Sequence, residues 1–257
     1  MDLEQDKLRE FLDAKVKQYN RPFFIESDPI SIPHRFQTNE DIEIAGFLTA
    51  TISWGNRVSI LKNASRLLDL MDNSPYDFVM NHQEIDFKRM EGFVHRTFNA
   101  SDLIVFITAL KQLYTNQNGL EGVFDTYKTN DSLQPAIYQL KQLFFAVAHL
   151  PRTRKHVSDP LAGSAAKRIN MFLRWMVRKD DAGVDFGIWK TISPAILSCP
   201  LDVHSGNVAR KLGLLRNKQN NAKAVHELDL ALRKLDSKDP VKYDYALFGL
   251  GVFEKLR

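Results

Sequence analysis

The sequence of 257 residues contains a single cysteine, Cys199, so it can form neither an intramolecular disulfide nor a zinc site built from cysteines. Long apolar runs are also missing. The stretch 45–52 is interrupted by Gly46, Thr49 and Thr51, and it is far shorter than the ~20 residues that cross a bilayer. Residues 1–6 are acidic where a secretory signal is basic and then apolar. These absences predict a cytoplasmic protein that makes no membrane contact.

Stretches in which β-branched residues alternate with polar ones are not sustained anywhere, so no strand is predicted. Apolar residues instead recur at helical spacing, and a hydrophobic content of 44% is ample for a core. The prediction is an all-α fold. No fixed-period repeat or low-complexity linker is present, which favours one unit over 1–257 made of two packed lobes. We expect one lobe at 40–178 and the other at 1–39 plus 190–257.

Helix boundaries follow from capping residues and breakers. Thr38 and Asp41 have the spacing of a capping box, which opens a helix. Prolines at 22, 29 and 33 predict an extended connector over 23–36. The predicted helices are 3–19, 38–53, 59–71, 75–81, 101–116, 119–127, 133–149, 164–178, 202–212, 221–235 and 239–254.

Positive charge is concentrated in residues 151–179, where eight lysines and arginines accompany only Asp159. Such a local excess is typical of a surface that contacts the phosphates of a nucleic acid. A solvated helix face rich in lysine and arginine explains the same charge run equally well.

Small residues at 162–166 predict a tight turn directly before a helix. Small side chains let backbone amides approach a ligand, and a helix N-terminus attracts anions. Lys167 falls in the first turn of that helix, where the helix dipole and partial burial favour its neutral, nucleophilic form. Downstream, Asp202 stands at the entry of a second helix, which Gly213 ends.

Three segments together resemble the helix-hairpin-helix DNA glycosylase superfamily. Residues 161–170 resemble its Leu-Pro-Gly-Val-Gly-x-Lys-Thr-Ala-Asn hairpin, with Gly163, Lys167 and Asn170 in register. Residues 200–214 resemble its Val-Asp-Thr-His-Val-x-Arg-Val stretch, and residues 47–56 its opening helix and turn. The long separation between Lys167 and Asp202 is most similar to the archaeal 8-oxoguanine glycosylase branch.

The resemblance implies a two-lobed glycosylase-like fold with a helix-hairpin-helix element, acting on double-stranded DNA that carries a damaged base, with an oxidised purine among the expected lesions. Lys167 is then the nucleophile that attacks the sugar C1′ and forms a Schiff base, which permits strand cleavage as an AP lyase. Asp202 stabilises the positive charge of the transition state. No cofactor and no metal are expected, and the location implied is the nucleoid.

The resemblance and the charge pattern suggest further site residues. Asp202 alone is equally a helix cap, and the tryptophans Trp54, Trp175 and Trp189 are as readily core residues as base-stacking ones. Neither His95 nor His156 has a partner at metal-ligand spacing. The candidates for contact with the DNA backbone are Gly163, Ser164, Ala165, Arg168, Arg152, Arg154 and Lys155, and those for the base pocket are Trp54, Asn56 and His204.

Two departures from the superfamily pattern support other interpretations. Ala165 replaces the second hairpin glycine, and Ala162 replaces the proline before the first. An altered hairpin favours a DNA- or RNA-binding module that lacks chemistry. A third interpretation is a structural helical protein whose basic segment docks on an acidic protein. The sequence indicates neither the lesion nor the oligomeric state.

Overall fold

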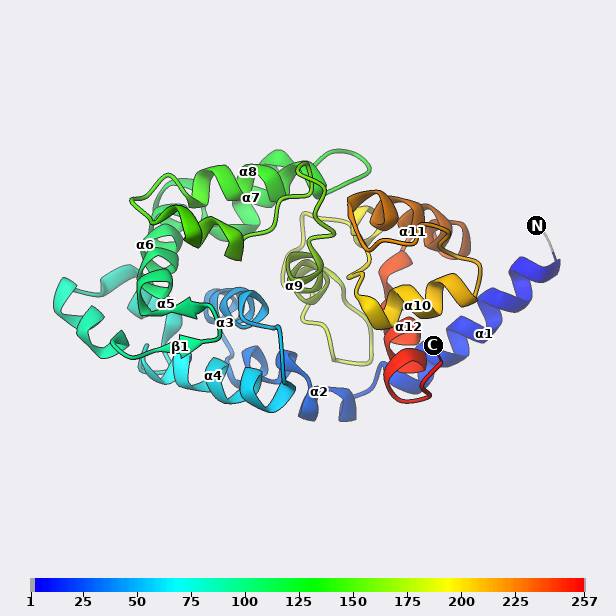
Figure 1. Ribbon diagram of the computed structural model, residues 1–257, viewed down its shortest axis with the longest axis horizontal. Coiled ribbons are helices and arrows are strands. Elements are labelled where there is room, and N and C mark those ends of the chain that lie inside the picture. Colours follow the sequence, from blue (N-terminus) through cyan, green and yellow to red (C-terminus); the bar gives the residue numbers. More distant parts are fainter. Residues whose placement is uncertain (1–2, 257) are drawn as a thin grey trace. The chain divides into compact units, whose positions relative to one another are not determined.

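The computed structural model describes residues 3–256, and within them the chain is all-α apart from one two-stranded antiparallel ladder (Figure 1). It divides into two compact units that are interleaved in sequence. The first unit comprises Met1–Phe24, Thr129–Pro135 and Asp159–Arg257, and the second comprises Ile25–Lys128 and Ala136–Ser158. No helix in this described part of the chain combines the length and apolar character needed to cross a membrane.

The two units differ from the lobes expected from the sequence, 40–178 and 1–39 plus 190–257. Residues 159–178 belong with the C-terminal helices rather than with the helices that precede them, and residues 25–39 belong with the second unit. The physical reason is that the segment around Gly163 pairs with the chain entering the helix at 222, where Ala222 N donates to Gly163 O at 3.0 Å.

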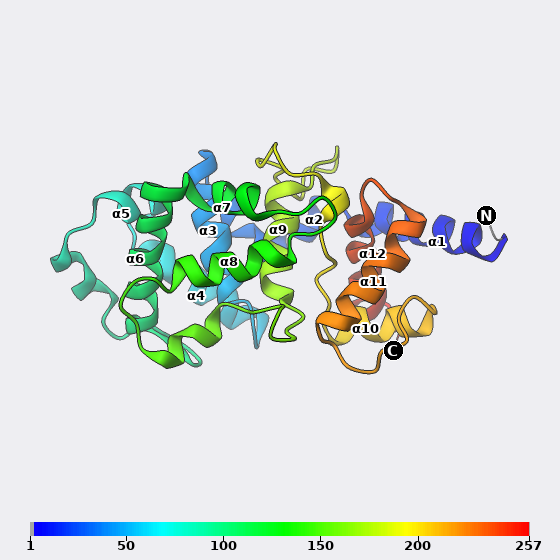
Figure 2. The ribbon, with the colours of Figure 1, turned by 90° about the horizontal axis from the view of Figure 1, so that it is seen from above.

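The first unit is a bundle in which α12 lies alongside both α1 and α10 (Figures 1 and 2). On α11 the residues Val225, Leu228, Leu232 and Leu235 recur three or four positions apart, so they form one apolar face, and that face is buried in the core. The helices of this unit are α1 (Leu3–Tyr19), α9 (Lys167–Val177), α10 (Val203–Lys211), α11 (Ala222–Leu235) and α12 (Tyr243–Val252), with 3-10 helices at Pro194–Ile196 and Pro240–Lys242.

The second unit has an aromatic core in which Phe106 contacts the rings of Phe47, Phe98 and Phe144. Its first long helix starts as predicted, because the Thr38 side chain accepts a hydrogen bond from Asp41 N. The helices are α3 (Asn39–Thr51), α4 (Arg57–Asp69), α5 (Pro75–Asn81), α6 (Ala100–Gln117) and α7 (Gly119–Tyr127). The boundaries between the two units fall inside two further helices, α2 (Phe23–Ser27) and α8 (Gln134–Phe144).

Two expectations about local structure are wrong. The segment 23–36 is not an extended connector, since α2 and two 3-10 helices, Pro29–Ser31 and Pro33–Arg35, occupy it. Each of these prolines stands at the first position of a helical turn, where its missing N–H costs nothing. A strand pair also exists, β1 (Val94–His95) with β2 (Phe98–Asn99). Two residues per strand are too few to produce a detectable alternation.

Candidate functional site

The turn before α9 is held by its own backbone. Gly163 N donates to Pro160 O at 2.9 Å, and Ser164 N donates to Asp159 O at 3.1 Å. Gly163 has a φ of +91°, a conformation that favours glycine. Ser164 also pairs with Asn221 in an isolated antiparallel bridge. The amides of Gly163 and Ser164, which the sequence suggested as phosphate donors, are therefore already engaged inside the protein.

The first turn of α9 begins directly after this segment. Ala166 precedes α9 in the left-handed region, with a φ of +46°, and no side chain caps this helix. Within residues 3–256, the N–H groups of Lys167 and Ile169 have no acceptor, because intrahelical bonding starts with Asn170 N donating to Ala166 O. Two helix-terminal amides at the positive end of the dipole thus stand beside the Lys167 side chain.

Asp202 occupies the N-cap of α10. Its Oδ1 accepts from His204 N at 2.8 Å and from Ser205 N at 3.0 Å, and Ser205 Oγ accepts from Asp202 N in return. This reciprocal capping fixes the carboxylate orientation. Asn220 donates to Asp202 O at 2.8 Å, which ties the cap to the loop before α11.

The fixed carboxylate brings its second oxygen to Lys167. Lys167 Nζ lies 3.7 Å from Asp202 Oδ2, and the side chains are 32% and 25% exposed. One oxygen of Asp202 therefore caps a helix while the other faces an amine that solvent reaches. His204, the neighbouring base-pocket candidate, is exposed at the same helix entry.

Behind this pair lies a buried acid. Burial raises the pKa of Asp244 to about 6, an effect opposed by Arg174 and reinforced by the nearby Asp202 carboxylate. Arg174 Nη1 is bonded to Asp244 Oδ2. Cys199 is buried beside them, with Sγ 3.9 Å from Asp244 Oδ1, and burial holds the pKa of its thiol well above the ordinary range.

The basic segment is not the open positive surface suggested by its composition. Arg174 and Arg178 are buried and paired with Asp185, at 3.2 Å and 3.0 Å. In the second unit Arg152 pairs with buried Asp102 at 3.0 Å. Nor is α9 a solvated helix face, because its side chains are mostly buried. Asp185 belongs to the loop that follows α9, and its carboxylate neutralises two arginines of that segment.

The remaining candidates are distributed between the units. Arg168 is half-buried in α9, and burial lowers its pKa. In the second unit, Arg154 lies over the ring of Phe145, 5.1 Å from its centroid, while Lys155 is exposed. Asn56, a base-pocket candidate, caps α4 by accepting from Ser59 N at 3.2 Å.

The three tryptophans have different environments. Trp54 is half-buried in the second unit, with its ring edge-on to His95 at a centroid distance of 4.9 Å. Trp175 and Trp189 are buried in the first unit, and Trp189 packs edge-on to Phe172. Core packing accounts for Trp175 and Trp189, whereas Trp54 keeps an exposed part.

Sequence reasoning missed the buried carboxylates. Asp185, Asp229 and Asp244 lie in the interior of the first unit. Spacing carries no signal for them, because Asp244 meets Arg174 from a helix far along the chain. Asp185 offered a weak signal, since an acidic loop directly after a basic helix suggests local neutralisation.

Comparison with known proteins gives one family. No curated protein and no solved structure matches the chain. The matching segment, residues 28–253, takes in nearly all of the second unit and, in the first, the turn at Gly163, Lys167 and Asp202. The chain belongs to the family described as "Protein of unknown function (DUF2400)".

Proposed function

We propose that the protein is a DNA glycosylase with an associated lyase activity, which acts through Lys167 on duplex DNA carrying a damaged base. The observation that supports this most directly is the 3.7 Å separation between Lys167 Nζ and Asp202 Oδ2 at a solvent-accessible position. An amine beside a carboxylate can transfer a proton to it and then attack carbon. The resemblance of the surrounding segments to the glycosylase superfamily points to the same pair.

The chemistry follows from the two side chains. Lys167 attacks C1′ of an extrahelical nucleotide, a C–N bond forms, and the bond between C1′ and the base breaks. The base leaves with the bonding electrons. Asp202 Oδ2 faces the positive charge that develops on the sugar, accepts the proton that the amine loses, and passes it to the departing base. Ring opening then gives a Schiff base on Lys167, and β-elimination breaks the C3′–O bond.

Binding of the DNA backbone is assigned to the start of α9. The N–H groups of Lys167 and Ile169 have no acceptor within residues 3–256, and they stand at the positive end of the helix dipole. A phosphate held there lies beside the nucleophile on the same turn of helix. This contact replaces the one expected from Gly163 and Ser164, whose amides are used internally.

The test is covalent trapping. The protein is incubated with borohydride and duplexes that carry an abasic site or an oxidised, alkylated or deaminated base, and the adduct is resolved by denaturing electrophoresis. We expect an adduct with the wild type and none with Lys167→Ala. Lys211→Ala is the matched control, because Lys211 is an exposed lysine at the far end of α10. Absence of any adduct, or an adduct that persists in Lys167→Ala, contradicts the proposal.

A non-catalytic DNA- or RNA-binding role is the second candidate. It is favoured by Ala165, at the position of the second hairpin glycine, and by the internal engagement of the adjacent amides. The two candidates separate in one comparison. If the protein is a binding module without chemistry, the wild type and Lys167→Ala should bind a given nucleic acid, duplex or single-stranded, with the same affinity. Neither should release a base, and the affinity of both should fall steeply as the salt concentration rises.

A further inference from the structure

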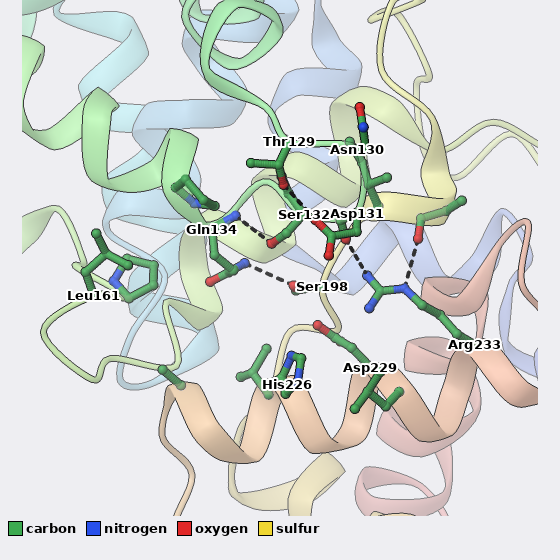
Figure 3. Close-up of a pocket in the computed structure, with 17 residues that line it drawn as sticks. Thr129, Asn130, Asp131, Ser132, Gln134, Leu161, Ser198, His226, Asp229 and Arg233 are labelled. Carbon is green, nitrogen blue, oxygen red and sulfur yellow. Dashed lines mark hydrogen bonds between the residues drawn. The ribbon is translucent and has the colours of Figure 1, made fainter.

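The first unit contains a cavity of about 690 Å³ whose lining shares no residue with the Lys167 and Asp202 pair. It lies between one face of α11, the segment Thr129–Pro135 and residues 195–198 (Figure 3). Small-molecule sites in proteins occupy roughly 300–1,000 Å³. The cavity therefore has the size of a site for a nucleoside-sized molecule.

The walls of the cavity are largely apolar. Pro135 and Ile196 line it, and Val225 and Leu230 face it from α11. Leu230 is 49% exposed and Leu161, at the rim, is 64% exposed. Apolar side chains left open in the lining of a cavity gain free energy when they cover an apolar ligand.

One end of the cavity is polar and rich in hydrogen-bond acceptors. Gln134 Nε2 donates to Asn170 Oδ1 and to Ser198 Oγ, both at 3.0 Å, so both of its N–H groups are used. Its amide oxygen is left as an acceptor and faces the space above α11 (Figure 3). The Asp229 carboxyl lines the same space from α11 (Figure 3). It is 4% exposed and accepts hydrogen bonds from Cys199 N at 2.9 Å and from the Ser198 side chain.

Backbone carbonyls hold the Arg233 guanidinium on the cavity wall through its Nε and Nη2 atoms. Arg233 Nε donates to Ala195 O at 3.0 Å, and its Nη2 donates to Leu197 O at 3.1 Å and to Asp131 O at 3.4 Å. These bonds tie two loops to α11 and hold the walls in place. These bonds use Nε and Nη2 of Arg233, while the acceptors Gln134 and Asp229 call for a ligand that donates N–H groups.

Burial raises the pKa of Asp229 to about 7, against the lowering effects of hydrogen bonds from Ser198 and Cys199 and of the Arg233 charge. A carboxyl that is partly protonated near neutral pH can both donate and accept. Such a group matches a ring edge on which an N–H and an unprotonated nitrogen or carbonyl stand side by side.

We propose that this cavity binds a neutral nitrogen heterocycle of nucleobase or nucleoside size, with its N–H edge on Gln134 and Asp229 and its faces against the apolar walls. The site is independent of Lys167 and goes beyond the proposed reaction. It is nevertheless connected to the turn before α9, because Asn170, the acceptor of Gln134, donates to Ala165 O at 3.1 Å.

The experiment is a titration of the full-length protein with adenosine, guanosine, 8-oxoguanosine and uridine, followed by calorimetry and by methyl NMR of the leucines, isoleucines and valines. We expect saturable binding of at least one nucleoside, with shifts at Val225, Leu230 and Ile196. A parallel titration with a short single strand distinguishes a free base from one attached to a chain. No saturation up to about 5 mM, weaker than the affinity of even poor specific sites, overturns the proposal.

Two variants sharpen the result. Asp229→Asn keeps the shape and changes the hydrogen-bond pattern, and we expect affinity to fall about tenfold, which corresponds to 1.4 kcal/mol. Ala222→Trp fills the rim and should abolish binding, whereas Lys223→Trp, the next residue outward and absent from the lining, should not. Equal affinity in wild type and Asp229→Asn contradicts the assigned edge.

Failure of this proposal and failure of the proposed reaction are distinguishable. Lys167→Ala should remove the trapped adduct and leave nucleoside affinity unchanged, because Lys167 does not line the cavity. Nucleoside binding without any adduct supports the cavity proposal and contradicts the glycosylase proposal. An adduct without nucleoside binding supports the glycosylase proposal and contradicts the cavity proposal.

Discussion

Arg174 Nε lies 3.2 Å from Asp185 Oδ1, and the two side chains are almost completely buried. The other oxygen of the same carboxylate, Oδ2, accepts a hydrogen bond from Arg178 Nη1 at 3.0 Å. Tyr245 lies beneath the pair, with the Arg174 guanidinium 4.3 Å from its ring centroid. Asp185 is thus the shared counter-ion of two interior arginines.

Removing this counter-ion should destabilise the fold strongly. Asp185→Ala leaves two buried guanidinium groups with fewer partners, and we expect a loss of about 3–5 kcal/mol in the free energy of unfolding. Urea denaturation followed by circular dichroism measures it. Asp181→Ala is the control in the same loop, since Asp181 is exposed, and it should change stability by less than about 0.5 kcal/mol. Equal effects of the two substitutions contradict the shared role.

The two roles of Asp202 can be separated by one substitution. Asparagine is as good an N-cap as aspartate, so Asp202→Asn should change stability by only a few tenths of a kcal/mol, whereas Asp202→Ala should cost about 1 kcal/mol. Both variants remove the negative charge that faces Lys167 at 3.7 Å. We therefore expect both to slow adduct formation about a hundredfold or more. If Asp202→Asn forms the adduct at the wild-type rate and only the less stable Asp202→Ala is slower, Asp202 acts only as a helix cap.

Titration of the Asp229 carboxyl should make the free energy of unfolding depend on pH. Burial raises its pKa from the ordinary 3.8 to about 7, so the folded state binds this proton more tightly than the unfolded state. The associated stability is fully present below about pH 4 and is lost as the pH rises through 7, with a slope of up to about 1.4 kcal/mol per pH unit.

Asp229→Asn should flatten that slope between pH 4 and pH 7, as urea denaturation at a series of pH values measures. The groups facing the carboxyl are Arg233, Ser198, Cys199 and, on the cavity wall, His226. Asp244, whose pKa is raised to about 6, contributes a slope that remains in both proteins. Parallel curves for wild type and variant are incompatible with a buried, proton-binding Asp229.

Close packing of α1 on α12 gives a further prediction. A Cβ added at Gly249 meets the Tyr19 ring at 2.1 Å, far inside van der Waals contact. In an open helix Gly→Ala adds about 1 kcal/mol of stability, but here we expect Gly249→Ala to lower it by about 1–3 kcal/mol. Thermal unfolding measures the change. The double variant Tyr19→Ala with Gly249→Ala should lose less than the two single changes combined, and simple additivity contradicts the contact.

Local features could be predicted and tertiary ones could not. The limits of α1, α5 and α7 follow from short-range spacing and breakers, and the Thr38 cap was visible in four residues of sequence. The juxtaposition of Lys167 and Asp202 was expected only through resemblance to a known family. The pairing of Arg178 with Asp239 at 2.9 Å joins distant segments, and no local pattern encodes it. Composition therefore overstated the open positive charge.

The first unit is assembled from three separate stretches of chain, including the short segment Thr129–Pro135. Its opening helix, α1, has its principal partner in α12, which ends at Val252. During synthesis α12 therefore cannot cover the apolar side of α1 until residues 243–252 have been made. Deleting α12 removes the helix that covers α1, so we expect a chain that lacks α12 to leave the first unit incompletely folded.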